Sequence, residues 1–186
     1  IGCIINVKSV TDLEPTALMK HETKWLVEAL EKAHYSKVSI KNLDSMSFID
    51  RYLEKLDKQK LYFLKNDVEK FRSSFEPTLV TFFEQGNLFP GFEIYNSYKQ
   101  NSIERIEWAI SYLDEFPDLE SNRSYEPDRS RLEWATSVDA LEDIWENLIT
   151  FEFLNETISQ LDINNTLEDI PDTNLTKAQE ESKKIL

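Results

Sequence analysis

Glycine is nearly absent from this chain, and its scarcity restricts the fold more than any other feature of the sequence. Only Gly2, Gly86 and Gly91 occur among 186 residues. Tight hairpin turns need glycine, so the sequence argues against an all-β fold with many short strands. The G-x-G-x-x-G and G-x-x-x-x-G-K-[ST] phosphate loops also need spacings that three such glycines do not provide. With few prolines and many Leu, Glu and Lys residues, the chain is predicted to be all-α. We expect an irregular multi-helix domain of about six to eight helices with long ordered loops.

Apolar residues recur every three or four positions in several segments, which predicts amphipathic helices. Caps and breakers then place the ends of these segments. The predicted helices are Pro15 to about His34, one capped by Asp44 or Ser45 that carries Phe48 to Leu56, one from a cap at Asn66 or Asp67 to about Ser74, Glu76 to near Gly86, Pro90 to Phe116, one capped by Ser137 that ends at Leu161, and one capped by Asn174 that spans Leu175 to Leu186.

Two of these segments carry apolar stripes that we expect to face a core. The first stripe consists of Trp25, Leu26, Ala29, Leu30 and Ala33. The second, after Ser137, consists of Val138, Leu141, Ile144, Trp145, Leu148, Phe151, Leu154, Ile158 and Leu161. Residues 118–136 are polar but contain Tyr125, Leu132 and Trp134, which a disordered tether would lack, so they are predicted to form an ordered loop.

Charge is distributed unevenly along the chain. The formal net charge is -14; residues 1–75 hold 13 basic and 11 acidic residues, whereas residues 76–186 hold 8 and 24. Nucleic acid is therefore not expected as a partner, because phosphate binding needs clustered cations. An anionic membrane surface is disfavoured for the same reason. The acidic half is interpreted as a solvated face, with electrostatic docking of a basic partner as the alternative.

No pattern for catalysis or for a cofactor is found. His21 and His34 are the only histidines, and no H-E-x-x-H or G-x-S-x-G motif is present. Asp139, Glu142, Asp143 and Glu146 lie at helical spacing and could attract a divalent cation, but a solvated helix face is the simpler interpretation. We therefore predict no catalytic residue, no metal ligand and no cofactor in these residues.

The stretch Phe48 to Phe71 carries a more specific signal than any of these patterns. It reads FIDRYLEKLDKQKLYFLKNDVEKF and resembles a phrase in the N-terminal domain of the tail-specific proteases, also called C-terminal processing peptidases. The matching residues are Phe48, Asp50, Arg51, Tyr52, Leu53, Leu56, Asp57, Leu64, Asp67, Val68 and Phe71. Two further blocks match in the same order, His34-Tyr35 before it and Glu104-Arg105, Tyr112-Leu113, Tyr125-x-x-Asp128-Arg129-Ser130, Trp134 and Leu141 to Trp145 after it. The sequence departs from the family pattern at Thr150-Phe151, where the family often has Lys-Phe.

The resemblance implies a division of the chain and structural roles for its motif residues. Residues 1–14 would be a lead segment, 15–161 the helical domain, and 162–186 a connector and helix leading towards a PDZ domain outside this sequence. Structural roles are expected for Tyr35, Asp50, Arg51, Tyr52, Leu53, Asp67, Phe71, Asp128, Arg129 and Trp145, with direct contact to a partner as the alternative. Among these, Asp50 and Arg51 are expected to pair with backbone groups or another helix, and Asp128 and Arg129 to fasten the long loop.

The resemblance also implies where the parent protein works and what it contacts. The family's enzymes act in the bacterial cell envelope, recognise the C-termini of non-native or precursor proteins through a PDZ domain, and cleave them with a Ser-Lys dyad. The expected partners of this domain are the PDZ and peptidase domains of the same chain and an adaptor protein. The start Ile1-Gly2-Cys3 is similar to the end of a bacterial lipoprotein signal, which would make Cys3 a lipidation site; an ordinary cysteine is the alternative. Because no stop signal follows Ile185-Leu186, we expect a longer natural chain.

Two other functions fit the sequence. A free-standing helical module with an acidic docking face would bind a basic partner in a salt-sensitive manner. An acid-base hydrolase would use paired carboxylates, although no second chemical group accompanies them.

Overall fold

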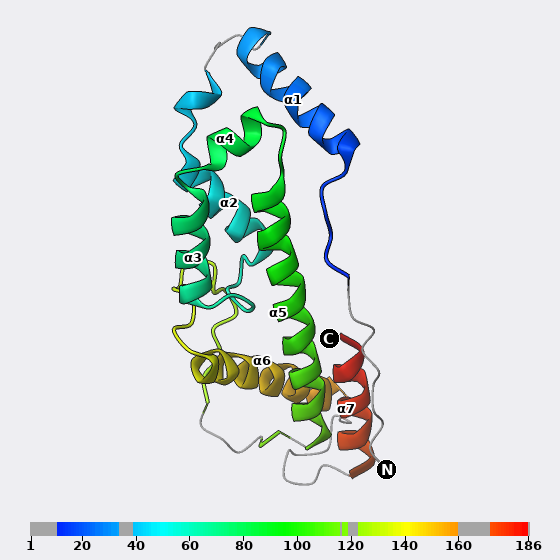
Figure 1. The fold of residues 1–186 in the computed structure, drawn as a ribbon. Helices are drawn as coiled ribbons and strands as arrows, with labels where there is room; N and C mark the ends of the chain where they lie inside the picture. The colour runs from blue at the N-terminus through cyan, green and yellow to red at the C-terminus, as the bar shows by residue number, and fades with distance from the viewer. Residues whose placement is uncertain (1–10, 34–38, 116, 119–122, 160–171, 186) are drawn as a thin grey trace. The chain divides into compact units, whose positions relative to one another are not determined.

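The computed structural model describes residues 11–33, 39–115, 117–118, 123–159 and 172–185. These residues form seven α-helices and one short 3-10 helix, joined by loops, and contain no strand beyond one isolated bridge (Figure 1). The all-α prediction is confirmed. The chain divides into two compact units. The first consists of the residues up to Leu56 together with Asn66–Gln100, and the second consists of Asp57–Lys65 together with the residues from Asn101 onward.

The first unit is built from short helices packed around aromatic and aliphatic side chains. It contains α1 (Ala17–Lys32), η1 (Ile40–Asn42), α2 (Ser45–Leu56), most of α3 (Lys65–Phe75), α4 (Leu79–Glu84) and the N-terminal half of α5 (Phe89–Asp114). Its buried side chains include Ile49, Leu53, Val68, Phe71, Phe75, Leu79 and Ile94.

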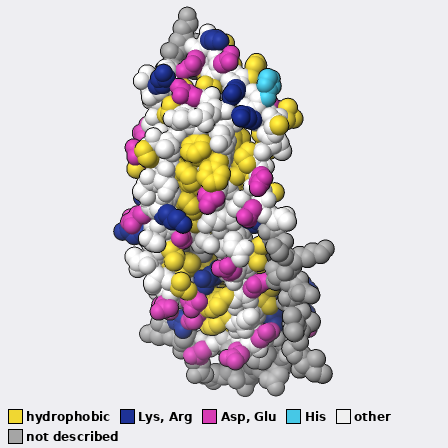
Figure 2. Space-filling model, viewed as in Figure 1, with side chains coloured by type: hydrophobic (Ala, Val, Ile, Leu, Met, Phe, Trp, Pro, Cys, Tyr) yellow, Lys and Arg dark blue, Asp and Glu magenta, His cyan; other side chains and the backbone are white. Residues whose placement is uncertain are grey.

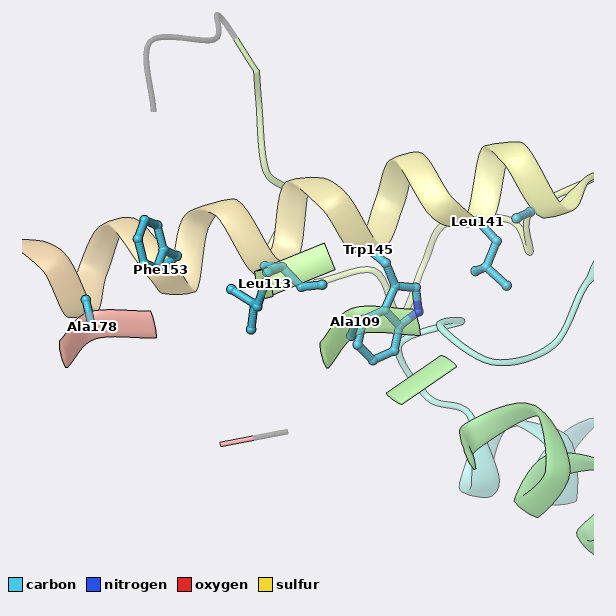
Figure 3. Close-up of a cluster of buried hydrophobic side chains, with 8 residues drawn as sticks. Ala109, Leu113, Leu141, Trp145, Phe153 and Ala178 are labelled. Atoms are coloured by element: carbon cyan, nitrogen blue, oxygen red, sulfur yellow. The ribbon is translucent and has the colours of Figure 1, made fainter. Parts of the chain in front are cut away.

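The second unit has its core along one row of α6 (Val138–Ser159). Every fourth residue of this helix is buried, from Leu141 through Trp145, Ile149 and Phe153 to Thr157. This row packs with Ala109 and Leu113 of the C-terminal half of α5 and with Ala178 of α7 (Asp172–Ile185), as Figure 3 shows. Because residues four apart lie on one face of a helix, the row forms a continuous apolar ridge.

Several predicted helix starts are confirmed by side-chain caps. The Asp44 carboxylate accepts the Ser47 N–H at 3.0 Å at the start of α2, and the Ser137 hydroxyl accepts the Ala140 N–H at 3.2 Å at the start of α6. Both satisfy N–H groups that the first turn of a helix leaves unpaired. Pro90 lies in the first turn of α5, as predicted.

Two predicted caps are wrong. The helix expected from Asn66 or Asp67 begins at Lys65, whose N–H donates to the Ala135 carbonyl at 2.8 Å, next to a parallel bridge between Leu64 and Ala135. The last helix begins at Asp172 and not after Asn174. In the first case, the N–H group at the helix start bonds a backbone carbonyl 70 residues further along the chain, where the local sequence had predicted a side-chain cap.

The predicted apolar stripes need correction in two helices. No residue of α1 is buried, and Trp25, Leu26 and Leu30 are 68%, 53% and 42% exposed. In α6, Val138, Phe151 and Ile158 are exposed, because the buried row runs through Ile149 and Phe153 instead. This helix carries apolar residues on most of its circumference, so periodicity alone does not identify the buried face.

Candidate functional site

A buried carboxylate, Asp57, organises the polar centre of the second unit. Asp57 is 2% exposed and follows directly after α2. Its oxygens accept the backbone N–H groups of Leu61, Tyr62 and Phe63 at 2.7, 3.0 and 2.9 Å. The Trp134 indole N–H adds a fourth contact at 3.3 Å. A buried carboxylate needs such donors, so Asp57 fixes the turn that follows it.

Lys60 fastens the same turn to the loop before α6. Its ammonium donates to the carbonyls of Ser130, at 2.9 Å, and Leu132, and lies 4.9 Å from the centre of the Trp134 ring. Lys60 adopts a left-handed backbone with φ of 57°, a conformation that costs a residue with a side chain about 1 kcal/mol or more. We call Asp57, Lys60 and Trp134 the Asp57 cluster.

Asp128 and Arg129 hold the loop before α6 through contacts with backbone groups. The Asp128 carboxylate accepts the Ser130 N–H at 3.1 Å, and the Ser130 hydroxyl and N–H together lower the pKa of Asp128. The Arg129 N–H donates to the Gln59 side chain at 2.7 Å, and burial lowers the pKa of the Arg129 guanidinium. Tyr125 stacks on Phe151 with ring centroids 4.7 Å apart. The described part of this loop is therefore ordered, as predicted.

Three motif residues of α2 have defined positions in the first unit. Asp50 forms an ion pair with Arg72 of α3 at 2.7 Å. The Tyr52 hydroxyl donates to the Gly91 carbonyl at 3.1 Å, and burial of the ring raises the pKa of Tyr52. Leu53 is fully buried. These side chains therefore join α2 to its neighbours α3 and α5.

The remaining motif residues divide into buried, exposed and undescribed groups. Phe71 is buried and stacks on Phe75, and the buried Trp145 donates its indole N–H to the Leu61 carbonyl at 2.7 Å. Arg51 is exposed, and Asp67 lies in the first turn of α3. Tyr35 and Cys3 lie outside the described residues.

An apolar groove opens on the first unit, with a cavity of about 410 Å³. Figure 2 shows apolar side chains gathered on the face in view, in the region of α2, α4 and the N-terminal half of α5. Among the described residues, no charged side chain lines this groove. Its lining consists of Leu13, Phe48, Ile49, Tyr52, Leu79, Phe83, Leu88, Pro90, Gly91, Phe92, Ile94 and Tyr95. Its size falls in the range of roughly 300–1,000 Å³ that is typical of ligand sites.

The chain's own residues before α1 lie along the edge of this groove. The side-chain amide of Asn96 donates to the Leu13 carbonyl and accepts the Leu13 N–H, both at 2.9 Å. Lys99 donates to the Thr11 carbonyl at 2.9 Å. Both residues project from α5, so one helix holds the main chain of an incoming segment at three points. We call Asn96 and Lys99 the α5 clamp.

The acidic residues of α6 form ion pairs in the second unit. Glu142 pairs with Arg105 at 3.6 Å and Glu146 with Arg123 at 2.6 Å, and the latter contact raises the pKa of Arg123. Within the described residues, no three His, Cys, Asp or Glu side chains are placed to hold a metal ion. In the same part of the chain, no helix has the length and apolarity needed to cross a membrane.

Comparison with known proteins identifies the family. The model of the family described as "Tail specific protease N-terminal domain" matches residues 26–186. This chain belongs to that family. It is also 28% identical, over 133 residues, to the tail-specific protease of Haemophilus influenzae strain ATCC 51907 / DSM 11121 / KW20 / Rd. That match covers 72% of this chain and 19% of the relative, so the matched part spans less than a fifth of the relative's length.

The sequence of this tail-specific protease domain did not indicate the groove, the α5 clamp or most of the Asp57 cluster. Asn96 and Leu13 are 83 residues apart in the chain, and Asp57 and Trp134 are 77 residues apart. A polar residue on a helix gives no sign of such a distant partner. The one available signal was Asp57 itself, since it follows an amphipathic helix and lies shortly before four apolar residues in a row, where a free carboxylate would be costly.

Proposed function

We propose that this chain is the non-catalytic N-terminal helical domain of a periplasmic tail-specific, C-terminal processing serine protease. Its role is to support the substrate chamber and to dock against the other domains of the parent chain or an adaptor protein. The observation that carries this proposal is the family match over residues 26–186, combined with a relative five times longer than the matched segment. The parent's PDZ domain and Ser-Lys dyad would lie downstream of these residues, and its substrates would be the C-terminal tails of non-native or precursor proteins, as the resemblance in sequence implies.

The engagement of the motif residues supports a structural role. Asp50 is paired with Arg72, Trp145 donates to Leu61, and Asp57 receives four donors. Side chains fully used in internal contacts hold a scaffold, whereas a catalytic group needs access to a substrate.

The exposed face of α1 supports a docking role. Leu18 and Trp25 are 64% and 68% exposed, and Leu26 and Leu30 are also exposed. We call these four residues the α1 face. Aromatic and aliphatic residues exposed together on one helix are typical of a surface that another part of a protein covers. In the parent protease, another domain or the adaptor would cover the α1 face.

The size of the natural polypeptide tests the assignment to a larger protease. An antibody raised against this domain should detect a band several times larger than 21.9 kDa in cells. A band near 21.9 kDa without a larger precursor would favour the free-standing acidic module instead.

A cleavage assay tests the non-catalytic role. The purified 186-residue chain should fold, as measured by circular dichroism, and should not cleave a fluorogenic peptide, whereas the parent protease cleaves it. Cleavage that stays with the chain through successive purification steps would contradict the proposal.

Variants of the α1 face test the docking role in the parent protease. Trp25→Ser with Leu26→Ser should lower peptide cleavage by the parent several-fold while the isolated domain keeps its unfolding midpoint. Glu22→Ser, at an exposed position of the same helix, is the matched control and should leave cleavage unchanged. Equal activity of the two variants would exclude a docking role for this face.

A further inference from the structure

We propose that the apolar groove of the first unit is a binding site for an extended polypeptide segment of another protein that presents an aliphatic side chain. The chain's own Thr11–Leu13 segment occupies one edge of the same site and competes with that partner. This inference rests on the contacts of the first unit and goes beyond the proposed scaffold role.

The α5 clamp recognises a main chain and not a particular sequence. Asn96 pairs with both the N–H and the carbonyl of Leu13, so it satisfies an extended residue as a neighbouring strand would. Lys99 contributes a third contact, to the Thr11 carbonyl. Any extended segment can offer these backbone groups, whereas a hydrocarbon chain offers none. The clamp therefore favours a peptide over a lipid tail.

The groove specifies the side chain that the segment presents. The described residues of its lining are uncharged and include the aromatic rings of Phe48 and Phe83, whose centroids lie 5.3 Å apart in an edge-to-face arrangement. A charged side chain would lose its hydration there without a partner, whereas an aliphatic one gains from burial. The expected ligand is thus an extended segment whose main chain bonds to the α5 clamp and whose leucine-like side chain enters the groove.

The described part of the chain's own segment leaves the site incompletely covered, so a partner segment can displace it. Leu13 remains 48% exposed although it lines the groove, so a segment that places a side chain deeper buries more apolar area. The Asn96 amide has one set of partners, and it therefore holds one segment at a time. Because the Thr11–Leu13 segment is tethered, its effective concentration is high and it weakens the apparent affinity for a peptide in trans.

A labelled peptide tests the site directly. The probe is a fluorescein-labelled synthetic peptide with the sequence of residues 9–16, SVTDLEPT, and its fluorescence anisotropy is measured against the 186-residue chain and its Leu13→Asp variant. Leu13→Asp places a carboxylate against a lining that offers it no charged partner, so the chain's own segment should leave the groove and release its main-chain contacts with the clamp. This variant should therefore bind the probe at least about tenfold more tightly than the unchanged chain. A probe in which Asp replaces its leucine should not bind.

The clamp variant decides whether binding uses the proposed site. In the Leu13→Asp background, Asn96→Asp removes the donor to the peptide carbonyl and should abolish binding. The matched control is Asn155→Asp, which makes the same change at an exposed position of α6 and should have no effect. Absence of binding by Leu13→Asp, or binding that Asn96→Asp leaves unchanged, would overturn the proposal. Should circular dichroism show that Leu13→Asp does not fold, Leu13→Ser takes its place in the same comparison.

Discussion

A single buried carboxylate, that of Asp57, accepts four hydrogen bonds in the second unit. Asp57 is 2% exposed and accepts three consecutive backbone N–H groups and one indole N–H. These donors lie in the turn after α2 and in the loop before α6. Without the carboxylate, buried N–H groups would have no acceptor, and each unsatisfied group costs about 1–3 kcal/mol.

Replacing Asp57 should therefore destabilise the protein strongly. We expect Asp57→Ala to lower the free energy of unfolding by about 3–5 kcal/mol, since several buried donors lose their acceptor at once. Urea unfolding followed by tryptophan fluorescence measures this loss. Glu107→Ala, at an exposed position of α5, should cost less than about 0.5 kcal/mol. A loss below about 1 kcal/mol for Asp57→Ala would show that water replaces the carboxylate.

Residue types at several of these positions were predictable, but their partners were not. The sequence indicated that Phe71 and Trp145 belong in a core, because large aromatic residues on helical stripes are usually buried. It gave no sign that the Trp145 indole meets the Leu61 carbonyl or that Lys60 contacts the Trp134 ring. Such contacts join residues more than 70 positions apart, and local spacing holds no information about them.

At the scale of helices, local rules succeeded where the deciding contact is local. The caps at Asp44 and Ser137 each bond a backbone N–H three residues away, so the sequence contains both partners. The predicted start of α3 was wrong because the Lys65 N–H bonds the distant Ala135 carbonyl. The predicted buried face of α6 was wrong because apolar residues lie on most sides of this helix, and tertiary packing buries the row through Ile149.

The Asp44 cap should make the stability of α2 depend on pH. The Ser47 N–H and hydroxyl lower the pKa of Asp44 below its ordinary value of 3.8. This contribution is therefore fully present above about pH 3.8 and is lost as pH falls through the lower pKa of the folded state. Asp44→Asn keeps a good capping side chain but cannot titrate. The stability difference between the two proteins should narrow or reverse on acidification from pH 6 to pH 2.5.

Urea unfolding at a series of pH values measures that difference. Asp12→Asn serves as the control, since Asp12 is an exposed aspartate outside the helices. A gap between the parent chain and Asp44→Asn that stays constant over this pH interval would contradict an ionised cap.

Gly86 allows close approach between the segment after α4 and helix α1. It has φ of 67°, and a Cβ added there would overlap the Lys20 carbonyl and lie 2.8 Å from the Lys24 Cγ. Gly86→Ala should therefore lower the free energy of unfolding by about 1–3 kcal/mol and loosen α1. Hydrogen exchange of α1 and urea unfolding measure the two effects.

Gly91 provides a matched control for that substitution. An added Cβ at Gly91 meets nothing within 4 Å, and the residue lies in the first turn of α5, where alanine loses less backbone entropy on folding than glycine. Gly91→Ala should thus leave stability unchanged or raise it. Equal destabilisation by both substitutions would refute the steric argument for Gly86.

At the scale of the whole molecule, the division into two compact units was not predictable from the sequence. Each unit combines segments that are distant in the chain, because the chain passes from one unit to the other after Leu56, after Lys65 and after Gln100. The last of these points lies inside the continuous helix α5. Linker signals such as Pro-rich or Gly-rich stretches mark boundaries between successive domains, and none is needed where a helix contributes to both units.

This division predicts that local unfolding is confined to one unit at a time. Trp145→Phe removes the bond to the Leu61 carbonyl and part of a buried ring, at a cost of about 1–2 kcal/mol. Ile49→Val removes one methylene from the core of the first unit, at a cost of about 0.5–1.5 kcal/mol. Hydrogen exchange measured by mass spectrometry should show faster exchange in α6 and α7 for Trp145→Phe, and in α2 and α3 for Ile49→Val. Since α5 contributes to both units, its two halves should respond to different variants. Faster exchange throughout all helices with either variant would mean that the domain unfolds as a single cooperative body.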